Sequence, residues 1–179
     1  MRIPFDRRAH HVAAAVAAMA GLALLAAAPA QAQSQTSAVC TITLSASITP
    51  PFHPLVLVPA SGTVSSGGQT LTVTCLGAID GDRITGPGTG ALVYAYSNGT
   101  CVAHNGLGTV TWTIPTEAGP KQLTGTLTVR RIGLGVLAEV RFANARAVLA
   151  GALVPLAGDC VLTPLRRVGV TVAGLLTGT

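Results

Sequence analysis

The four cysteines are the residues whose type and spacing point most directly to chemistry: Cys40, Cys75, Cys101 and Cys160. A structural zinc site takes close pairs such as Cys-x-x-Cys. Here even the closest pair, Cys75 and Cys101, lies 26 positions apart (101 − 75). An even number of widely spaced cysteines in an exported chain is typical of disulfides. We therefore expect two disulfide bonds and no metal site.

Two pairings of these cysteines are open. Cys40 begins one expected strand and Cys75 ends another, so antiparallel neighbours place both at the same edge. Cys101 and Cys160 both lie in glycine-flanked loops. These positions favour Cys40 with Cys75 and Cys101 with Cys160. The alternative, Cys40 with Cys160 and Cys75 with Cys101, is nearly as good.

Residues for catalysis are scarce beyond position 32. Only two histidines, His53 and His104, and five acids are present there, and no Gly-x-Ser-x-Gly nucleophile motif occurs. Asp80-Gly81-Asp82 resembles a fragment of a calcium loop, but Arg83 follows where further oxygen ligands are required. We expect a polar turn at this place, no enzymatic activity and no cofactor.

Two further groups are candidate binding residues. Tyr94 and Tyr96 share one face of an expected strand, where they form either the wall of a ligand groove or an ordinary core pair. Arginines cluster late in the chain, and a solvated surface or a patch for an anionic cell-wall polymer or lipid surface explains them. Nucleic acid is not expected, because no aromatic residues are interleaved for base stacking. The patch residues are Arg130, Arg131, Arg141, Arg146, Arg166 and Arg167.

Strands must position all of these residues, since apolar and hydroxyl residues alternate with a period of two. In Cys40–Ile48 every apolar residue has one parity and every hydroxyl the other. Trp112 shares its parity with Val110 and Ile114, which predicts a core position. The expected strands are Cys40–Ile48, Leu55–Val58, Thr70–Cys75, Ala91–Ser97, Thr109–Ile114, Leu123–Val129, Val136–Phe142, Val148–Val154 and Val168–Val172.

Turn residues separate these segments, among them Asp80-Gly81-Asp82, Asn98-Gly99, Asn105-Gly106 and Ala118-Gly119-Pro120. Apart from the alanine-rich stretch 142–153, which is ambiguous, no segment has a helical stripe. We predict an all-β fold: a single antiparallel β-sandwich or closed β-barrel of about nine short strands, held by two disulfides.

The N-terminal 32 residues have the features of a signal peptide. A basic start precedes an apolar run, which ends in Ala30-Gln31-Ala32, the small-x-small pattern of a cleavage site. We expect a secreted or cell-envelope domain over residues 33–179. This part carries eight cations and five acids, a net charge of +3, and none of its apolar runs is long enough to span a membrane.

Turn and cysteine motifs throughout residues 33–179 resemble those of a group of small secreted actinobacterial proteins. The matching segments are Cys40–Leu44, Ile48–Pro51, Ser61–Gln69, Thr74-Cys75, Ile84–Thr89, Thr113–Pro115, Gly158–Cys160 and Thr163-Pro164. The group has no assigned activity, so the resemblance implies an architecture and no chemistry.

Two functions remain open. The first is a non-catalytic secreted or cell-envelope β module with a structural or surface-binding role. The second is a small β-barrel that binds an apolar ligand in its lumen, which the many aliphatic residues also allow.

Overall fold

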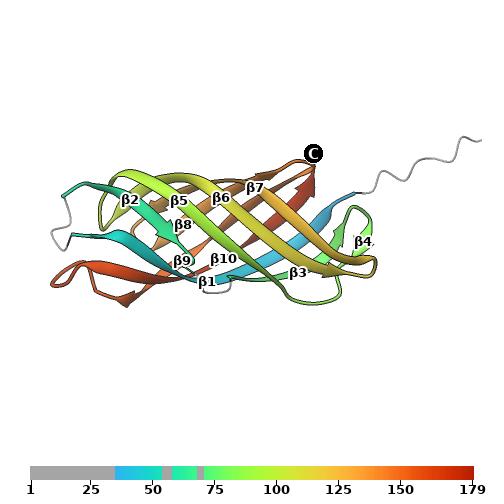
Figure 1. The fold of residues 1–179 in the computed structure, drawn as a ribbon, viewed down its shortest axis with the longest axis horizontal. Helices are drawn as coiled ribbons and strands as arrows, with labels where there is room; N and C mark the ends of the chain where they lie inside the picture. Colours follow the sequence, from blue (N-terminus) through green and yellow to red (C-terminus); the bar gives the residue numbers. More distant parts are fainter. Residues whose placement is uncertain (1–34, 54–57, 68–70) are drawn as a thin grey trace, which may run out of the picture. The chain divides into compact units, whose positions relative to one another are not determined.

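A computed structural model describes residues 35–53, 58–67 and 71–179, which belong to one compact unit. The predicted leader, residues 1–32, lies outside these described residues. The unit is all-β, as predicted (Figure 1). Its strands are β1 (Ser37–Phe52), β2 (Ala60–Ser65), β3 (Leu71–Ile79), β4 (Asp82–Arg83), β5 (Gly88–Gly99), β6 (Ala103–Thr116), β7 (Gly119–Ile132), β8 (Gly135–Phe142), β9 (Ala145–Ala157) and β10 (Leu165–Gly178).

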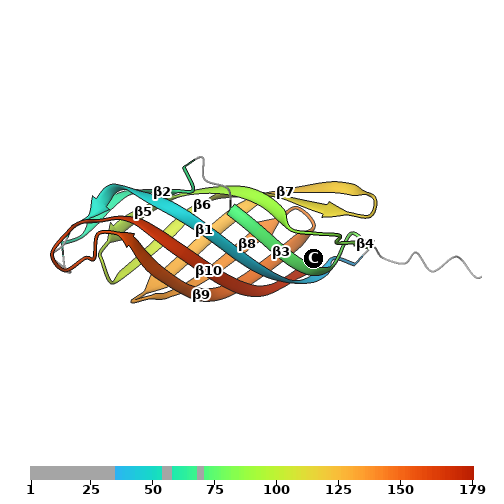
Figure 2. The ribbon, with the colours of Figure 1, turned by 90° about the horizontal axis from the view of Figure 1, so that it is seen from below.

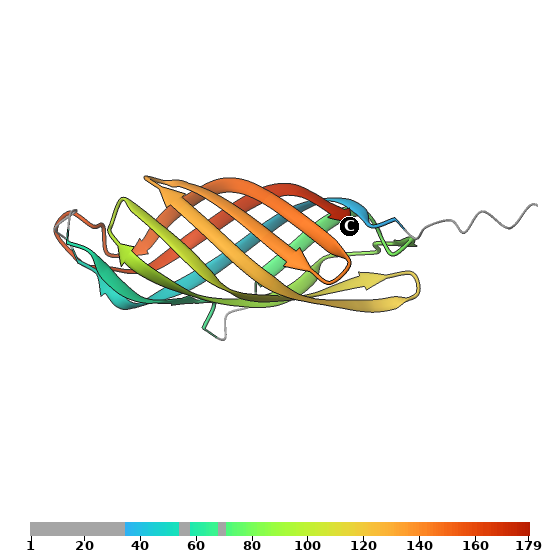
Figure 3. The ribbon, with the colours of Figure 1, turned by 90° about the horizontal axis from the view of Figure 1, so that it is seen from above.

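The strands form one antiparallel sheet that closes into a ring. The order is β10-β9-β8-β7-β6-β5-β2-β1-β3-β4, and further pairings of β10 with β1 and β5 with β3 complete the circle. Strands β2 and β3 both lie between β1 and β5, one after the other. Figure 2 shows β1 between β10 and β3, and Figure 3 shows the tilted strands on the other side. The fold is therefore a closed barrel and not a two-sheet sandwich.

Most strands are longer than predicted. β1 has 16 residues, and β6, β7 and β10 have 14 each. Strands that tilt around a barrel run further than strands of a flat sheet, which explains the difference. The strand expected at Leu55–Val58 falls mostly on residues 54–57, which are not described. β2 was not predicted, because its sequence Ala-Ser-Gly-Thr-Val-Ser has only one large apolar residue.

One predicted turn, Asn105-Gly106, is wrong. These residues lie inside β6, where Gly106 pairs with Tyr96 on one side and Val129 on the other. A Cβ atom on Gly106 would come within 2.3 Å of Cδ2 of Tyr94. The glycine is thus used for the close approach of an aromatic ring and not for a turn.

Inward-facing aliphatic and aromatic side chains fill the barrel. Trp112 is 1% exposed, which confirms its predicted place in the core, and its ring centroid lies 5.0 Å from that of Phe142. Alternation along the strands puts most threonine and serine side chains on the outside, whereas alanines occur on both faces. The alanine-rich stretch 142–153 follows the same rule within β8 and β9.

Both disulfides have the favoured pairing. Cys40 and Cys75 lie directly opposite each other on β1 and β3. Cys101 and Cys160 join the β5–β6 connection to the β9–β10 connection, across one end of the barrel. The described residues contain no helix with the length and apolar character needed to cross a bilayer.

The two ends of the barrel carry different connections. The "paired end" has the turns β3–β4, β6–β7 and β8–β9, together with the start of β1. The "arginine end" has the connections β5–β6, β7–β8 and β9–β10, together with Phe52 at the end of β1. In Figure 1 the paired end is on the right, where β10 finishes.

Candidate functional site

Cations and carboxylates lie beside one another at the paired end. The Nζ atom of Lys121 is 2.8 Å from Oδ2 of Asp82, and Arg83 lies 4.0 Å from Glu117. Oε1 of Glu139 lies 2.6 Å from Arg141 and 3.1 Å from Arg146. Hydrogen bonds from both arginines lower the pKa of Glu139. Among the described residues, this end holds four cations and four acids, the fourth acid being Asp80.

The structure does not gather the six candidate arginines into one patch. Antiparallel strands place Arg141 and Arg146 at the paired end, with Glu139. Arg130 lies near the end of β7, and Arg166 and Arg167 lie at the start of β10, all three exposed at the arginine end. Arg131 is 4% exposed, so its inclusion in a surface patch is corrected.

Asp159 is the acid of the arginine end, and it is engaged in its own loop. Its Oδ1 accepts hydrogen bonds from the backbone N–H groups of Val161, Leu162 and Thr163, at 3.0, 2.9 and 2.9 Å. These bonds, that of Thr163 first, lower the pKa of Asp159 to about 2. Among the described residues, this end therefore has four arginines and one carboxylate. Oδ1 of that carboxylate already accepts hydrogen bonds from its own loop.

Arg131 is a buried cation inside this end of the barrel. Its Nη2 donates to the carbonyl of Cys101 at 2.6 Å and its Nε to the carbonyl of Gly133 at 3.0 Å. Its Cζ lies 5.8 Å from the centre of the Phe52 ring. Burial lowers the pKa of the guanidinium. Nη1 is buried and has no hydrogen-bond acceptor in the described part of the chain.

His104 lies directly opposite Arg131, on β6, and also points inward. Its Nε2 is 2.9 Å from the hydroxyl of Tyr94. Burial, and then the charge of Arg131, lower the pKa of His104 to about 4. Burial raises the pKa of Tyr94 well above its ordinary value. Both rings are thus neutral near pH 7, and Nδ1 of His104 is buried without a partner among the described residues.

Tyr94 and Tyr96 do share a face, and that face is the interior. Tyr96 donates a hydrogen bond of 2.8 Å to the carbonyl of Pro50, and its ring packs 4.8 Å from that of Phe52. Tyr94 borders the internal cavity, whereas Tyr96 does not. Of the two candidate groove residues, Tyr94 is thus the one next to open space.

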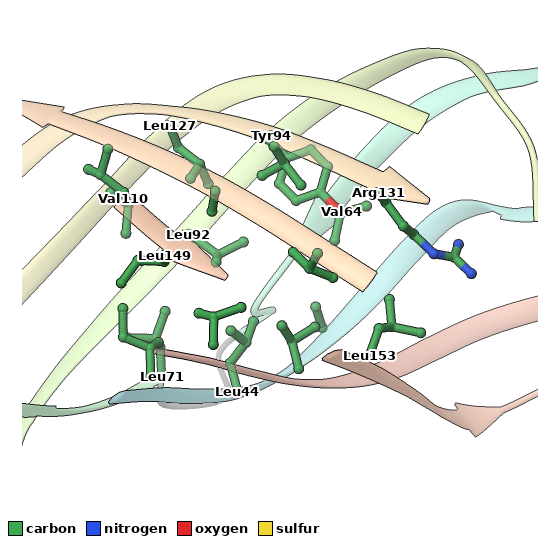
Figure 4. Close-up of a pocket in the computed structure, with 18 of the residues that line it drawn as sticks. Leu44, Val64, Leu71, Leu92, Tyr94, Val110, Leu127, Arg131, Leu149 and Leu153 are labelled. Carbon is green, nitrogen blue, oxygen red and sulfur yellow. The ribbon is translucent and has the colours of Figure 1, made fainter. Parts of the chain in front are cut away.

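An apolar cavity of about 60 Å³ remains inside the barrel. Aliphatic side chains converge on it, and the guanidinium of Arg131 lies at one end of it (Figure 4). A separate groove of about 500 Å³ opens at the arginine end and includes the polar residues Ser97, Asn98 and Asn105. His104 and Arg131 border both spaces. These two residues therefore separate the cavity from the groove.

Sequence reasoning missed the buried pair of His104 and Arg131, although a signal was present. Arg131 has the same parity as Leu127 and Val129, and His104 has that of Val110. Extending the alternation by a few residues places both side chains inside. His53, by contrast, is exposed.

The remaining sequence candidates form no metal centre. Asp80-Gly81-Asp82 is the turn between β3 and β4, where Lys121 contacts Asp82 and the hydroxyl of Thr36 donates to Asp80 at 3.3 Å. Throughout the described ranges, no three His, Cys, Asp or Glu side chains group together as metal ligands do.

Neither a family model, nor a curated protein, nor a solved structure matches this chain.

Proposed function

We propose that this protein is a non-catalytic extracellular module that binds an anionic cell-wall polymer through its arginine end. The observation that carries the proposal is the unequal charge of the two ends. Four cations and four acids lie at the paired end, whereas four arginines and one acid lie at the arginine end. Three of these arginines, Arg130, Arg166 and Arg167, have exposed side chains.

An extracellular location is supported by the two disulfides, which indicate oxidising surroundings. It is supported further by the leader sequence at residues 1–32. A disulfide across the arginine end fixes the loops beside the exposed arginines, which lowers the entropy lost when they bind a partner.

A non-catalytic role is supported by the state of the buried polar pair. Tyr94 and His104 are hydrogen-bonded, but a raised tyrosine pKa and a histidine pKa of about 4 keep both neutral. General acid–base catalysis works best with groups whose pKa lies near the working pH. This pair is poorly matched to that task.

The proposal is tested with a poly(glycerol phosphate) polymer and the oxidised protein. Binding should weaken on the order of tenfold between about 50 and about 150 mM salt, because roughly three phosphate contacts release counterions. Replacing Arg130, Arg166 and Arg167 with serine should abolish binding and leave the melting temperature almost unchanged, since exposed charges stabilise little.

The matched control replaces three arginines of the paired end, Arg83, Arg141 and Arg146, with serine. It removes the same charge and should bind normally. Equal loss in both variants, or retention of binding by the first, rejects the assignment to the arginine end. If the protein binds anionic lipid vesicles but not the polymer, the partner is a lipid surface and not a cell-wall polymer.

A large apolar ligand in the lumen is not what the geometry favours. Pockets for drug-sized ligands typically measure roughly 300–1,000 Å³. The internal cavity, about 60 Å³, has room for a much smaller molecule.

A further inference from the structure

We propose that the lumen binds a short-chain carboxylate, whose carboxylate group pairs with Arg131 and His104 and whose apolar chain enters the internal cavity. This site is inside the barrel, so it is independent of the polymer contact proposed for the exposed arginines.

Arg131 is 4% exposed, and no carboxylate is buried beside it among the described residues. The five acids beyond residue 32 are Asp80, Asp82, Glu117, Glu139 and Asp159, and none is among the buried residues. An isolated buried charge is costly unless it is paired and hydrogen-bonded. Two carbonyls satisfy Nε and Nη2, which leaves Nη1 for an external anion.

His104 supplies another donor beside Arg131. If the hydroxyl of Tyr94 donates to Nε2, the proton of the neutral imidazole resides on Nδ1. Nδ1–H is then a buried donor without an acceptor in the described residues. His104 and Arg131 are register partners on β6 and β7, so their donors belong to one short stretch of wall. Two N–H donors, one of them cationic, match the two oxygens of a carboxylate.

The internal cavity is suited to the apolar part of the ligand. Beyond Arg131, His104, Tyr94 and Trp112 the cavity is lined by aliphatic side chains alone, as the labelled leucines and valines in Figure 4 illustrate. A water-sized group needs about 10–15 Å³ of such volume. A cavity of about 60 Å³ therefore holds about four to six such groups, and if one of them is the carboxylate carbon, roughly three to five remain for the apolar chain.

A ligand can reach this position through the groove at the arginine end. The groove of about 500 Å³ adjoins the cavity at His104 and Arg131, so the proposed carboxylate position is next to the open side of the barrel. Arg130, which points outward beside Arg131, also borders this groove and adds positive charge there. A carboxylate reaching the groove thus meets a favourable field before it meets the buried guanidinium.

The test titrates straight-chain carboxylates, from acetate to octanoate, into the oxidised protein and follows the His104 ring and the Arg131 side chain by NMR. We expect saturable shifts of both side chains and the tightest binding near butyrate and pentanoate. Butylamine and butanol have the same number of carbons without the negative charge, and they should bind at least about tenfold more weakly than butyrate. Arg131→Gln should weaken butyrate binding by about tenfold or more, whereas the outward-facing control Arg130→Gln should change it about twofold at most.

Three results would overturn the proposal. One is the absence of any shift at His104 and Arg131 up to high carboxylate concentration. Another is equal binding of butyrate and butanol, which would show that the cavity takes apolar chains without recognising charge. The third is unchanged butyrate affinity in Arg131→Gln. If Arg131→Gln fails to fold, the comparison of butyrate with butylamine on the unchanged protein decides the question. Polymer binding by the exposed arginines is measured separately, so either proposal can fail alone.

Discussion

At the paired end each of the four described cations lies within 4.0 Å of a carboxylate, whereas Asp159 is the one described acid of the arginine end, and its Oδ1 already accepts three backbone N–H groups. The side chains that fill the interior also differ between the two halves of the barrel. Trp112 and Phe142 pack against each other in the half nearer the paired end, and Phe52, His104 and Arg131 fill the other half.

The two ends of one repeated hairpin architecture therefore differ in how far their charges are balanced by neighbouring charges of opposite sign. Charges that are already paired gain little from a new partner, because the existing ion pairs must first be broken. Arginines with fewer carboxylates around them lose less when they bind an anion. Under the proposed function, recognition is therefore expected at the arginine end.

The largest expected effect is in the apolar half. Trp112→Ala removes a ring that is 1% exposed and leaves a cavity beside Phe142, so the free energy of unfolding should fall by about 3–5 kcal/mol. Urea denaturation measures this. Thr111→Ala, at the neighbouring half-buried position, is the control and should change little. A loss below about 1 kcal/mol for Trp112→Ala would contradict the packing described.

Removing either disulfide should give the next largest effect, and the two bridges lie in different halves of the barrel. Replacing Cys101 and Cys160 with serine should lower the free energy of unfolding by about 2–5 kcal/mol, and so should the same change at Cys40 and Cys75. Their consequences should differ in place. Amide exchange should accelerate around His104 in the first variant and along β1 and β3 in the second, because the bridges lie there. The same exchange pattern in both would show that the ends are not mechanically separate.

A smaller effect follows from the pKa of His104. The unfolded chain has an ordinary histidine pKa of 6.5 and the folded chain about 4, so the unfolded state takes up the proton first as the pH falls. Stability from this residue is complete above about pH 6.5, declines from there to about pH 4, and then levels off, with a total loss of about 3 kcal/mol. Thermal melts across this range in the protein and in His104→Gln isolate the effect. Equal pH slopes in the two would refute it.

Removing carboxylates from the paired end should have the smallest effect on stability. It is also the most direct test of the difference between the two ends. Glu139→Gln with Asp82→Asn removes two carboxylates that contact three cations. The melting temperature should hardly change, because exposed ion pairs contribute little. Polymer binding should gain a second site, visible as a higher stoichiometry at low salt. Unchanged stoichiometry would mean that charge alone does not define the arginine end.

Much of the fold could be predicted from the sequence, because period-two alternation reports directly on which side of a sheet a residue faces. Closure of the ring could not. A strand in a barrel and a strand in a sandwich show the same alternation, and the pairing of Ser37 with Thr177 is a contact between the two extremes of the unit. Local turn signals also failed where packing decided, as at Gly106 beneath the ring of Tyr94.

The candidate site was harder to predict for a related reason. Arginine is usually exposed, so a cluster of arginines in sequence favours a surface patch. Antiparallel connections then separate neighbours in sequence, and Arg130 and Arg141 lie at opposite ends of the barrel. The buried guanidinium of Arg131 donates to the carbonyl of Gly133, two residues along the chain, and to that of Cys101, which only the folded chain brings to it.

The pairing of β1 with β10 makes the order of the strands cyclic. The described chain starts and finishes side by side, since the N–H of Gly178 donates to the carbonyl of Thr36 at 2.7 Å. The closed barrel therefore does not depend on which two neighbouring strands carry the ends of the chain. A circular permutant, joined across these two strands and opened at the exposed Glu117-Ala118 turn, would keep every neighbour that each strand has now.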